Sequence, residues 1–229
     1  MAESVNDAGS TLGLILNGGL ALRLGGVDKG LVLLAGRPMI ARAIERLAPQ
    51  CTALVNSANG DPARFAAFGL PVLADDPQDF AGPLAGVLAG LEISARMKPA
   101  VTHVATLPAD APFAPHDFIT KLHEARRTSR AEIAVAASGG RRHHVAALWP
   151  VALAGDLRRA LTGEGLRKVE DFSARYSIAL ADWPCEPVDP FFNVNTTDDL
   201  ARAEALVAAS CAGFHAPEAG EDGATKPRG

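Results

Sequence analysis

Short apolar runs alternate with helical patterns along residues 11–131, and this rhythm constrains the fold more than any other feature. An apolar run between turn residues is typical of a buried strand, and apolar residues spaced three and four apart are typical of a helix. Strands that alternate with helices indicate a mostly parallel sheet covered by helices on both faces. We predict strands at residues 12–16, 52–56, 71–74 and 101–107, and helices at residues 38–47, 62–68, 83–95 and 115–126.

The rhythm changes after residue 131. Two strand-like runs flank Ser138-Gly139-Gly140, and this arrangement predicts a β-hairpin. The remaining patterns complete a more irregular C-terminal third of the same domain. We predict strands at residues 132–137, 143–149 and 176–181, and helices at residues 151–161, 166–174 and 198–209.

Composition is that of an ordinary globular chain. Of 229 residues, 48% are apolar and 21% are charged, which is enough to build a sizeable core. We predict a single three-layer α/β domain over residues 11–211. The flanking segments, residues 1–10 and 212–229, have almost nothing to bury and are predicted to be disordered.

Charge and cysteine content exclude several classes of protein. The net charge of −4 argues against a nucleic-acid-binding surface. Cys51, Cys185 and Cys211 are far apart and include no CxxC pair, so neither a disulfide framework nor a zinc site is indicated. The N-terminal residues do not have the pattern of a signal peptide, and no uncharged apolar segment is long enough to cross a bilayer. We expect a cytoplasmic protein without nucleic-acid or membrane partners.

The segment from Asn17 to Gly30, NGGLALRLGGVDKG, is the most informative part of the chain. It follows the first predicted strand, at the edge where a parallel sheet binds its ligands. Its glycines let the backbone approach a phosphate chain. Arg23 can bind phosphate oxygens through two parallel bonds, and Lys29 adds a movable point charge. A plain connecting loop is the alternative, but glycines combined with two cations favour a phosphate-binding loop.

Two well-known phosphate-binding motifs do not fit this loop. A P-loop requires GxxxxGK[ST], whereas Lys29 here follows Asp28 and precedes Gly30. The dinucleotide fingerprint GxGxxG is also absent, because the glycines occur as adjacent pairs. The loop therefore belongs to neither of these classes.

Further motifs follow the loop in a fixed order. They are Gly36-Arg37-Pro38-Met39, Gly82-Pro83-Leu84-Ala85-Gly86, Pro108-Ala109-Asp110-Ala111-Pro112, and Asn193-Val194-Asn195-Thr196 with Asp198-Asp199-Leu200. Together with the loop, they resemble the motifs of molybdenum cofactor guanylyltransferases, bacterial enzymes that attach GMP from GTP to molybdopterin. The resemblance spans residues 12–205 and implies a three-layer Rossmann-like nucleotidyltransferase fold. It also implies GTP and molybdenum-carrying molybdopterin as substrates, Mg²⁺ as cofactor, and cofactor-insertion or acceptor molybdoenzymes as protein partners.

The same resemblance implies roles for individual residues. Arg23, Lys29 and Asp110 are expected to act in catalysis, with Asp110 also binding the metal. The expected nucleotide-binding residues are Leu16, Asn17, Gly18, Gly19, Lys29, Asn56, Asp75 and Asp110. The expected acceptor-binding residues are Gly82, Arg142, His144, Asn193 and Asn195.

Residue chemistry alone leaves other interpretations open. Asp110 could cap the following helix, and Asp75 could belong to an acidic surface turn. The glycines at 82 and 86 could serve close helix packing, and the asparagines could form turns. Adjacent strand residues face opposite sides, so at most one of His143 and His144 is expected to face a ligand.

Two positions depart from the pattern of the family. Leu24 stands where Met is usual, a swap that conserves volume. Asn17 stands where Ala is usual and brings a polar amide close to the expected nucleotide. The alternatives for the whole chain are a cytidylyl- or sugar-nucleotide transferase of the same fold, a non-catalytic nucleotide- or pterin-binding protein, and an NAD-dependent oxidoreductase. The missing fingerprint disfavours the last of these.

Overall fold

The computed structural model describes residues 10–18, 20–21, 27–74, 82–98 and 100–212. The predictions of disorder at both ends therefore fall almost entirely outside the described residues. Of the two segments, Ser10 and Ala212 are described, and Ala212 ends a helix. No helix in the described part of the chain is long and apolar enough to cross a membrane.

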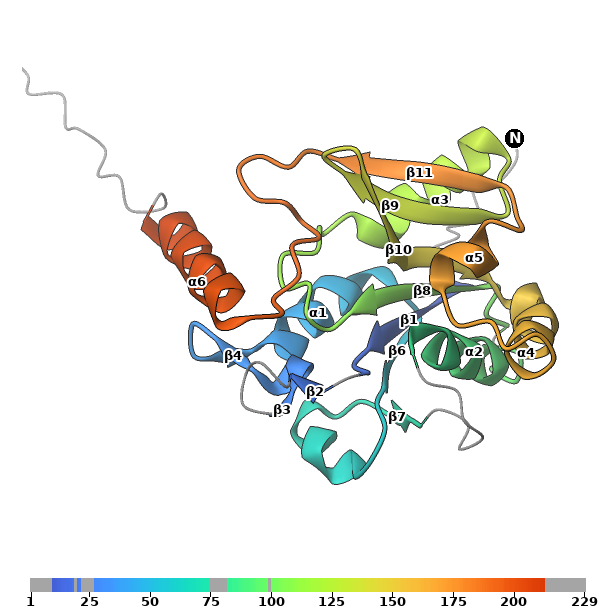
Figure 1. Ribbon diagram of the computed structural model, residues 1–229, viewed down its shortest axis with the longest axis horizontal. Helices are drawn as coiled ribbons and strands as arrows, with labels where there is room; N and C mark the ends of the chain where they lie inside the picture. The colour runs from blue at the N-terminus through green and yellow to red at the C-terminus, as the bar shows by residue number, and fades with distance from the viewer. Residues whose placement is uncertain (1–9, 19, 22–26, 75–81, 99, 213–229) are drawn as a thin grey trace, which may run out of the picture.

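A seven-stranded sheet forms the centre of the fold, in the order β11-β9-β10-β8-β1-β6-β7 (Figure 1). Neighbouring strands are parallel except at β10, which runs antiparallel to both β8 and β9. The predicted mostly parallel sheet and the predicted hairpin are both confirmed. The strands are β1 (Thr11–Leu16), β6 (Ala53–Ser57), β7 (Val72–Leu73), β8 (His103–Pro108), β9 (Ile133–Ser138), β10 (Arg141–Pro150) and β11 (Ile178–Trp183).

Helices cover both faces of the sheet, which gives the three predicted layers (Figure 1). On one face, Ile15 of β1 shares a buried core with Ile40 of α1 and Phe118 of α3. On the other face, Leu14 shares a core with Val87 of α2. Strand alternation sends the adjacent residues Leu14 and Ile15 into these two separate cores. The α-helices are α1 (Met39–Leu47), α2 (Pro83–Ser94), α3 (Phe118–Ser129), α4 (Ala154–Thr162), α5 (Val169–Ser173) and α6 (Thr197–Ala212).

Shorter elements connect these layers. The predicted helix at residues 62–68 is a 3₁₀ helix that begins at Pro62, and Asp61 caps it by accepting a hydrogen bond from the Ala63 N–H at 2.9 Å. The shorter elements are β2 (Leu20–Ala21), β3 (Val27–Asp28), η3 (Lys29–Leu31), β4 (Leu33–Leu34), β5 (Arg37–Pro38), η4 (Ala48–Gln50), η5 (Pro62–Phe68) and η6 (Val151–Leu153).

Helix α2 lies close to the sheet because two of its glycines face β1. A Cβ added at Gly86 would lie 2.6 Å from both Leu16 Cδ2 and Ser57 Oγ, and one added at Gly90 would lie 2.6 Å from Leu14 Cδ2. A side chain at either position would force these neighbours to shift, so close packing explains both glycines. The same approach brings the first turn of α2 to the carboxyl ends of the neighbouring strands.

Helix α6 joins the end of the chain to the segment that follows the glycine-rich loop. Val194 and Ala203 share a small buried core with Val32, Leu34 and Met39. Packing in this core holds the residues just before α6 at the carboxyl edge of the sheet, near β1 and β8.

Candidate active site

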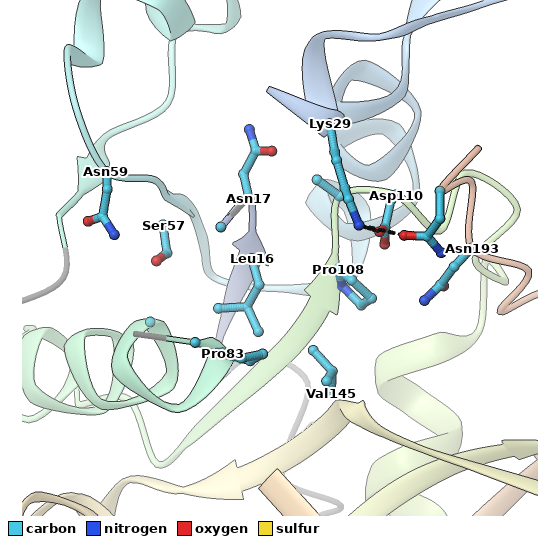
Figure 2. Close-up of a pocket in the computed structure, with 15 residues that line it drawn as sticks. Leu16, Asn17, Lys29, Ser57, Asn59, Pro83, Pro108, Asp110, Val145 and Asn193 are labelled. Atoms are coloured by element: carbon cyan, nitrogen blue, oxygen red, sulfur yellow. Dashed lines mark hydrogen bonds and ion pairs between the residues drawn. The ribbon is translucent and has the colours of Figure 1, made fainter. Parts of the chain in front are cut away.

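A cavity of about 460 Å³ opens at the carboxyl ends of β1, β6 and β8, beside the first turn of α2 (Figure 2). Parallel α/β sheets bind their ligands at this edge. The predicted site residues that line it are Leu16, Asn17, Gly18, Lys29, Gly82, Asp110, Asn193 and Asn195. It is also lined by Ser57, Asn59, Pro83, Gly86, Pro108, Ala109 and Val145.

Lys29, Asp110 and Asn195 form the polar centre of this cavity. The Lys29 ammonium lies 3.1 Å from Asp110 Oδ2 and donates a hydrogen bond of 2.5 Å to Asn195 Oδ1. The side chain of Lys29 is 28% exposed and that of Asp110 is 10% exposed, so the ion pair is shielded from bulk water. Lys29 and Asn195 are separated by 166 positions in the sequence, so the fold itself assembles the centre.

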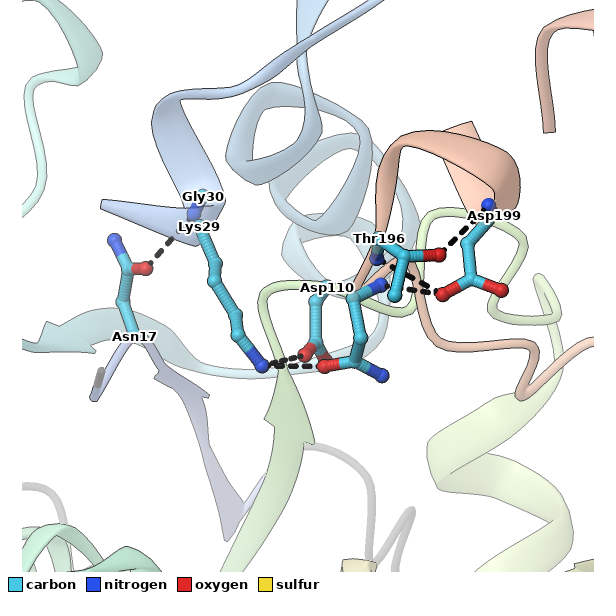
Figure 3. Close-up of polar contacts among 7 residues, drawn as sticks. Asn17, Lys29, Gly30, Asp110, Thr196 and Asp199 are labelled. Carbon is cyan, nitrogen blue, oxygen red and sulfur yellow. Dashed lines mark hydrogen bonds and ion pairs between the residues drawn. The ribbon is translucent and has the colours of Figure 1, made fainter. Parts of the chain in front are cut away.

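Asp199 at the start of α6 holds the backbone of Asn195 in place, and Figure 3 shows Asp199 beside Thr196. Asp199 Oδ2 accepts hydrogen bonds from the N–H groups of Asn195 at 3.0 Å and Thr196 at 2.9 Å, and Thr196 Oγ1 accepts one from the Asp199 N–H at 3.1 Å. This reciprocal arrangement is a capping box. The backbone N–H of Asn195 is the main reason that the pKa of Asp199 lies below its ordinary value.

Asp110 has the properties of a cation ligand. Its Oδ1 atom is buried and has no hydrogen-bond partner among the described residues, while Oδ2 contacts Lys29. No group of three His, Cys, Asp or Glu side chains that could hold a metal occurs in the described part of the chain. A hard divalent cation here would bind one carboxylate and take its remaining ligands from phosphates and water, a set typical of Mg²⁺.

The described parts of the glycine-rich loop are anchored on both sides. The Asn17 N–H donates to the Ser57 carbonyl at 2.9 Å, and Asn17 Oδ1 accepts a hydrogen bond from the Gly30 N–H at 3.1 Å. Asp28 forms an ion pair of 3.0 Å with Arg64 of η5. The predicted residues Gly19 and Arg23 lie outside the described residues.

One of the predicted nucleotide contacts, Asn56, does not line the cavity. Asn56 is fully buried, and neither atom of its amide group has a hydrogen-bond partner among the described residues. Its neighbour Ser57 lines the cavity instead, as does Asn59. Asp75 lies outside the described residues.

The β9–β10 hairpin separates its polar residues. Arg142 is exposed, and His144 Nδ1 lies 3.1 Å from Ser173 Oγ, so neither lines the cavity. His143 lies 2.7 Å from Ser138 Oγ instead, so the two imidazoles diverge as predicted. Burial lowers the pKa of both His143 and His144.

Several residues of this region were missed by reasoning from sequence. Ser57 was missed because β6 continues one residue beyond its predicted end. Asp199 carries a clearer signal, because Thr196 and Asp199 have the spacing of a capping box ahead of a helix. Nothing in the local sequence links Arg64 to Asp28, since their contact depends on tertiary structure.

An α/β sheet with a lysine, a carboxylate and a glycine-rich loop at its carboxyl edge defines the class of protein: the chain is a nucleotidyltransferase, a class that generally depends on a divalent metal. Residues 13–177 match the MobA-like NTP transferase domain family. The chain is 56% identical over 204 residues to a molybdenum cofactor guanylyltransferase of Rhodopseudomonas palustris, covering 89% of this chain and 95% of the relative. It is 45% identical to the enzyme of the same name from Rhizobium meliloti, covering 84% of this chain and 89% of the relative. The chain belongs to the family of molybdenum cofactor guanylyltransferases.

Solved structures agree with the fold. The molybdopterin-guanine dinucleotide biosynthesis protein A of Archaeoglobus fulgidus superposes with a TM-score of 0.68 at 22% identity, covering 87% of this chain and 99% of that chain. A 4-diphosphocytidyl-2C-methyl-D-erythritol synthase from Anaerococcus prevotii also gives 0.68, at 12% identity, covering 90% of this chain and 100% of that chain. The predicted Rossmann-like nucleotidyltransferase fold is therefore confirmed.

Proposed function

We propose that this chain transfers GMP from GTP to the terminal phosphate of molybdenum-carrying molybdopterin and releases pyrophosphate. The observation that carries the proposal is the contact of Lys29 with Asp110 and Asn195 at the polar centre of the cavity, beside the glycine-rich loop. Membership of the guanylyltransferase family supplies the identity of the base and of the acceptor.

The reaction needs positioning and charge neutralisation more than covalent help from the protein. An oxygen of the acceptor phosphate forms a bond to the α-phosphorus of GTP, and the bond from this phosphorus to the bridging oxygen breaks. The acceptor oxygen is already ionised at neutral pH, so no base is required, and pyrophosphate leaves with the electron pair. Lys29 and Arg23 would offset the negative charge that collects on the leaving group.

Asp110 would hold Mg²⁺ through its unpartnered Oδ1 atom, and Asn195 lies close enough to contribute to the same region. The bound ion would draw the phosphates together and neutralise part of their charge. The side chain of Asp110 thus serves two cations, because its other oxygen contacts Lys29.

The two substrates bind on two sides of the site in this proposal, and Asn56, Arg142 and His144 lie beyond the residues that line the cavity. The nucleotide side comprises Leu16, Asn17, Gly18, Gly19, Asn56 and Asp75, and the acceptor side comprises Gly82, Arg142, His144, Asn193 and Asn195. Both sides belong to one domain over residues 11–211. The cytoplasmic location and the acceptor molybdoenzymes as partners stay predictions.

Pyrophosphate release tests the proposal directly. The purified chain is incubated with Mg²⁺, molybdopterin-loaded acceptor and each of four nucleoside triphosphates. We expect release with GTP, and its loss in Asp110→Ala. Release with CTP or UTP in preference to GTP would contradict the guanylyl assignment, and binding of GTP without any release would contradict catalysis.

A further inference from the structure

We propose that Asn17 is a positioning residue that fixes Lys29 at the phosphate-binding end of the cavity, through a hydrogen bond and a steric fit with Gly30. The inference rests on the proposed function, in which Lys29 binds phosphate. Asn17 itself would act on the reaction through Lys29.

Asn17 links the sheet to the loop. Its backbone N–H continues the β1–β6 pairing by donating to the Ser57 carbonyl at 2.9 Å, so the residue is anchored to the sheet. Its side chain is directed to the opposite end of the loop, where Oδ1 accepts the Gly30 N–H at 3.1 Å (Figure 3). Lys29 directly precedes Gly30, so this bond sets where the lysine leaves the backbone.

The steric fit explains why position 30 is a glycine. A Cβ at Gly30 would lie 2.7, 2.8 and 2.9 Å from Oδ1, Nδ2 and Cγ of Asn17. Gly30 does not have the positive φ of the glycines at 36, 60 and 69. The absence of a side chain at Gly30 therefore makes room for the amide of Asn17, and the two residues depend on each other.

Burial of the Asn17 amide destabilises the folded state, and the hydrogen bond of its oxygen must offset that loss. Asn17 is 3% exposed, and its Nδ2 atom has no hydrogen-bond partner among the described residues. A buried donor without a partner destabilises the folded state, and an apolar side chain of similar size would avoid that loss. We attribute the presence of an amide to the bond that its oxygen makes with Gly30.

The bond between Asn17 and Gly30 also affects the geometry of the polar centre. The Lys29 ammonium contacts Asp110 Oδ2 and Asn195 Oδ1, and both distances depend on where the backbone at residues 29–30 lies. A displacement of about 1 Å in a group that positions substrate can cost about 100-fold in rate. A loop released from Asn17 would place the ammonium less accurately against a phosphate chain.

A double-mutant cycle tests the inference. Asn17→Ala, Gly30→Ala and the double variant are compared by calorimetric titration with inorganic pyrophosphate and by kcat and KM for GTP. We expect Asn17→Ala to weaken pyrophosphate binding about 10-fold and Gly30→Ala about 100-fold, since the added methyl group clashes with the amide. In the double variant the clash is gone, so its affinity should match that of Asn17→Ala, a coupling of about 100-fold.

Two controls separate positioning from general loss of structure. Gly90→Ala introduces an equally close contact, 2.6 Å from Leu14, but does not involve Asn17, so Asn17→Ala should not relieve it. Guanosine has no phosphate, and its affinity should be the same in Asn17→Ala and in the unmodified protein. If Gly30→Ala does not fold, the same coupling is measured as recovery of the melting transition in the double variant.

The outcomes distinguish this inference from the proposed function. Independent effects of the two substitutions, or pyrophosphate affinity unchanged in Asn17→Ala, would overturn the inference, as would failure of the unmodified protein to bind pyrophosphate. A protein that binds pyrophosphate but transfers no GMP would contradict the proposed function alone, and the cycle would still decide the role of Asn17.

Discussion

The polar centre (Lys29, Asp110 and Asn195) and the β9–β10 hairpin contribute side chains to the cavity in different ways. Lys29, Asp110 and Asn195 converge because each follows a strand or loop that ends at the same edge of the sheet. On β10, by contrast, Val145 lines the cavity while His144 contacts Ser173. A strand alternates its side chains between two faces, so consecutive polar residues separate. Single polar residues at strand ends are therefore stronger indicators of a site than a polar run along a strand.

The largest expected difference between the two regions concerns Asp110 and Arg142. We expect Asp110→Ala to lower kcat about 1,000-fold, because it removes the carboxylate that serves both Lys29 and the metal. Asp110→Asn keeps the shape and tests the charge. Arg142→Ala should raise the KM for molybdopterin a few-fold and leave the KM for GTP unchanged. Equal losses of kcat in the two alanine variants, measured by pyrophosphate release, would remove the distinction.

A smaller effect separates two asparagines of the same segment. Both Asn193 and Asn195 line the cavity, but Asn195 accepts the bond from Lys29. A hydrogen bond to a charged group contributes about 1.5 kcal/mol, which corresponds to about 10-fold. We expect Asn195→Ala to lower kcat/KM for GTP by that factor. Asn193→Ala is the matched control, and an equal or larger loss of GTP turnover there would show that the contact with Lys29 carries no weight.

The capping box of α6 should affect stability more than activity. We expect Asp199→Ala to lower the free energy of unfolding by about 1 kcal/mol, as for other helix caps, and to lower kcat only slightly. Asp198→Ala is the control, because Asp198 is in the same first turn. The folded-state pKa of Asp199 is lowered, so its contribution is present above the unfolded pKa and is lost as pH falls through the folded pKa. Urea unfolding should thus show a difference between the variants at neutral pH that vanishes in strong acid.

The smallest expected effect belongs to the hairpin. Burial lowers the pKa of His143 and His144 from the ordinary 6.5, so the unfolded chain binds more protons below that pH. Stability should therefore fall as pH drops through the ordinary histidine pKa of 6.5 toward the lowered folded-state pKa. His144→Gln should flatten this fall in the urea midpoint. An unaltered pH profile in His144→Gln would mean that this imidazole does not titrate differently on folding.

Sequence patterns predicted the elements well because alternation and helical spacing are local. Lys29 and Asp110 were both expected, from the family resemblance, to act in catalysis, and the structure brings them into contact. The contact of Asn195 with Lys29 was beyond such reasoning, because it depends on the core that Val194 forms with Val32. The capping motif at Thr196, in contrast, was visible in the sequence.

The position of the end of β6 differs between prediction and structure. The family resemblance implied a nucleotide contact at Asn56, which was expected to end the strand, and its role stays a prediction. In the structure the strand continues to Ser57, so the cavity wall there is Ser57 while Asn56 lies buried. Adjacent strand residues face opposite sides of the sheet, and sequence alone does not fix which of the two lies at the cavity.

Gly86, in the first turn of α2, constrains how the sequence of this cavity can evolve. Gly86 lines the cavity, and a Cβ there would lie 2.6 Å from side-chain atoms of Leu16 and Ser57, which would have to shift. That portion of the wall is therefore peptide backbone, and a substitution there would disturb the packing of α2 against the sheet. New substrate preferences would have to arise through exchangeable positions around it, such as Asn59 and Val145. We therefore expect position 86 to stay glycine among relatives of this protein, and the surrounding cavity residues to differ between relatives that prefer different ligands.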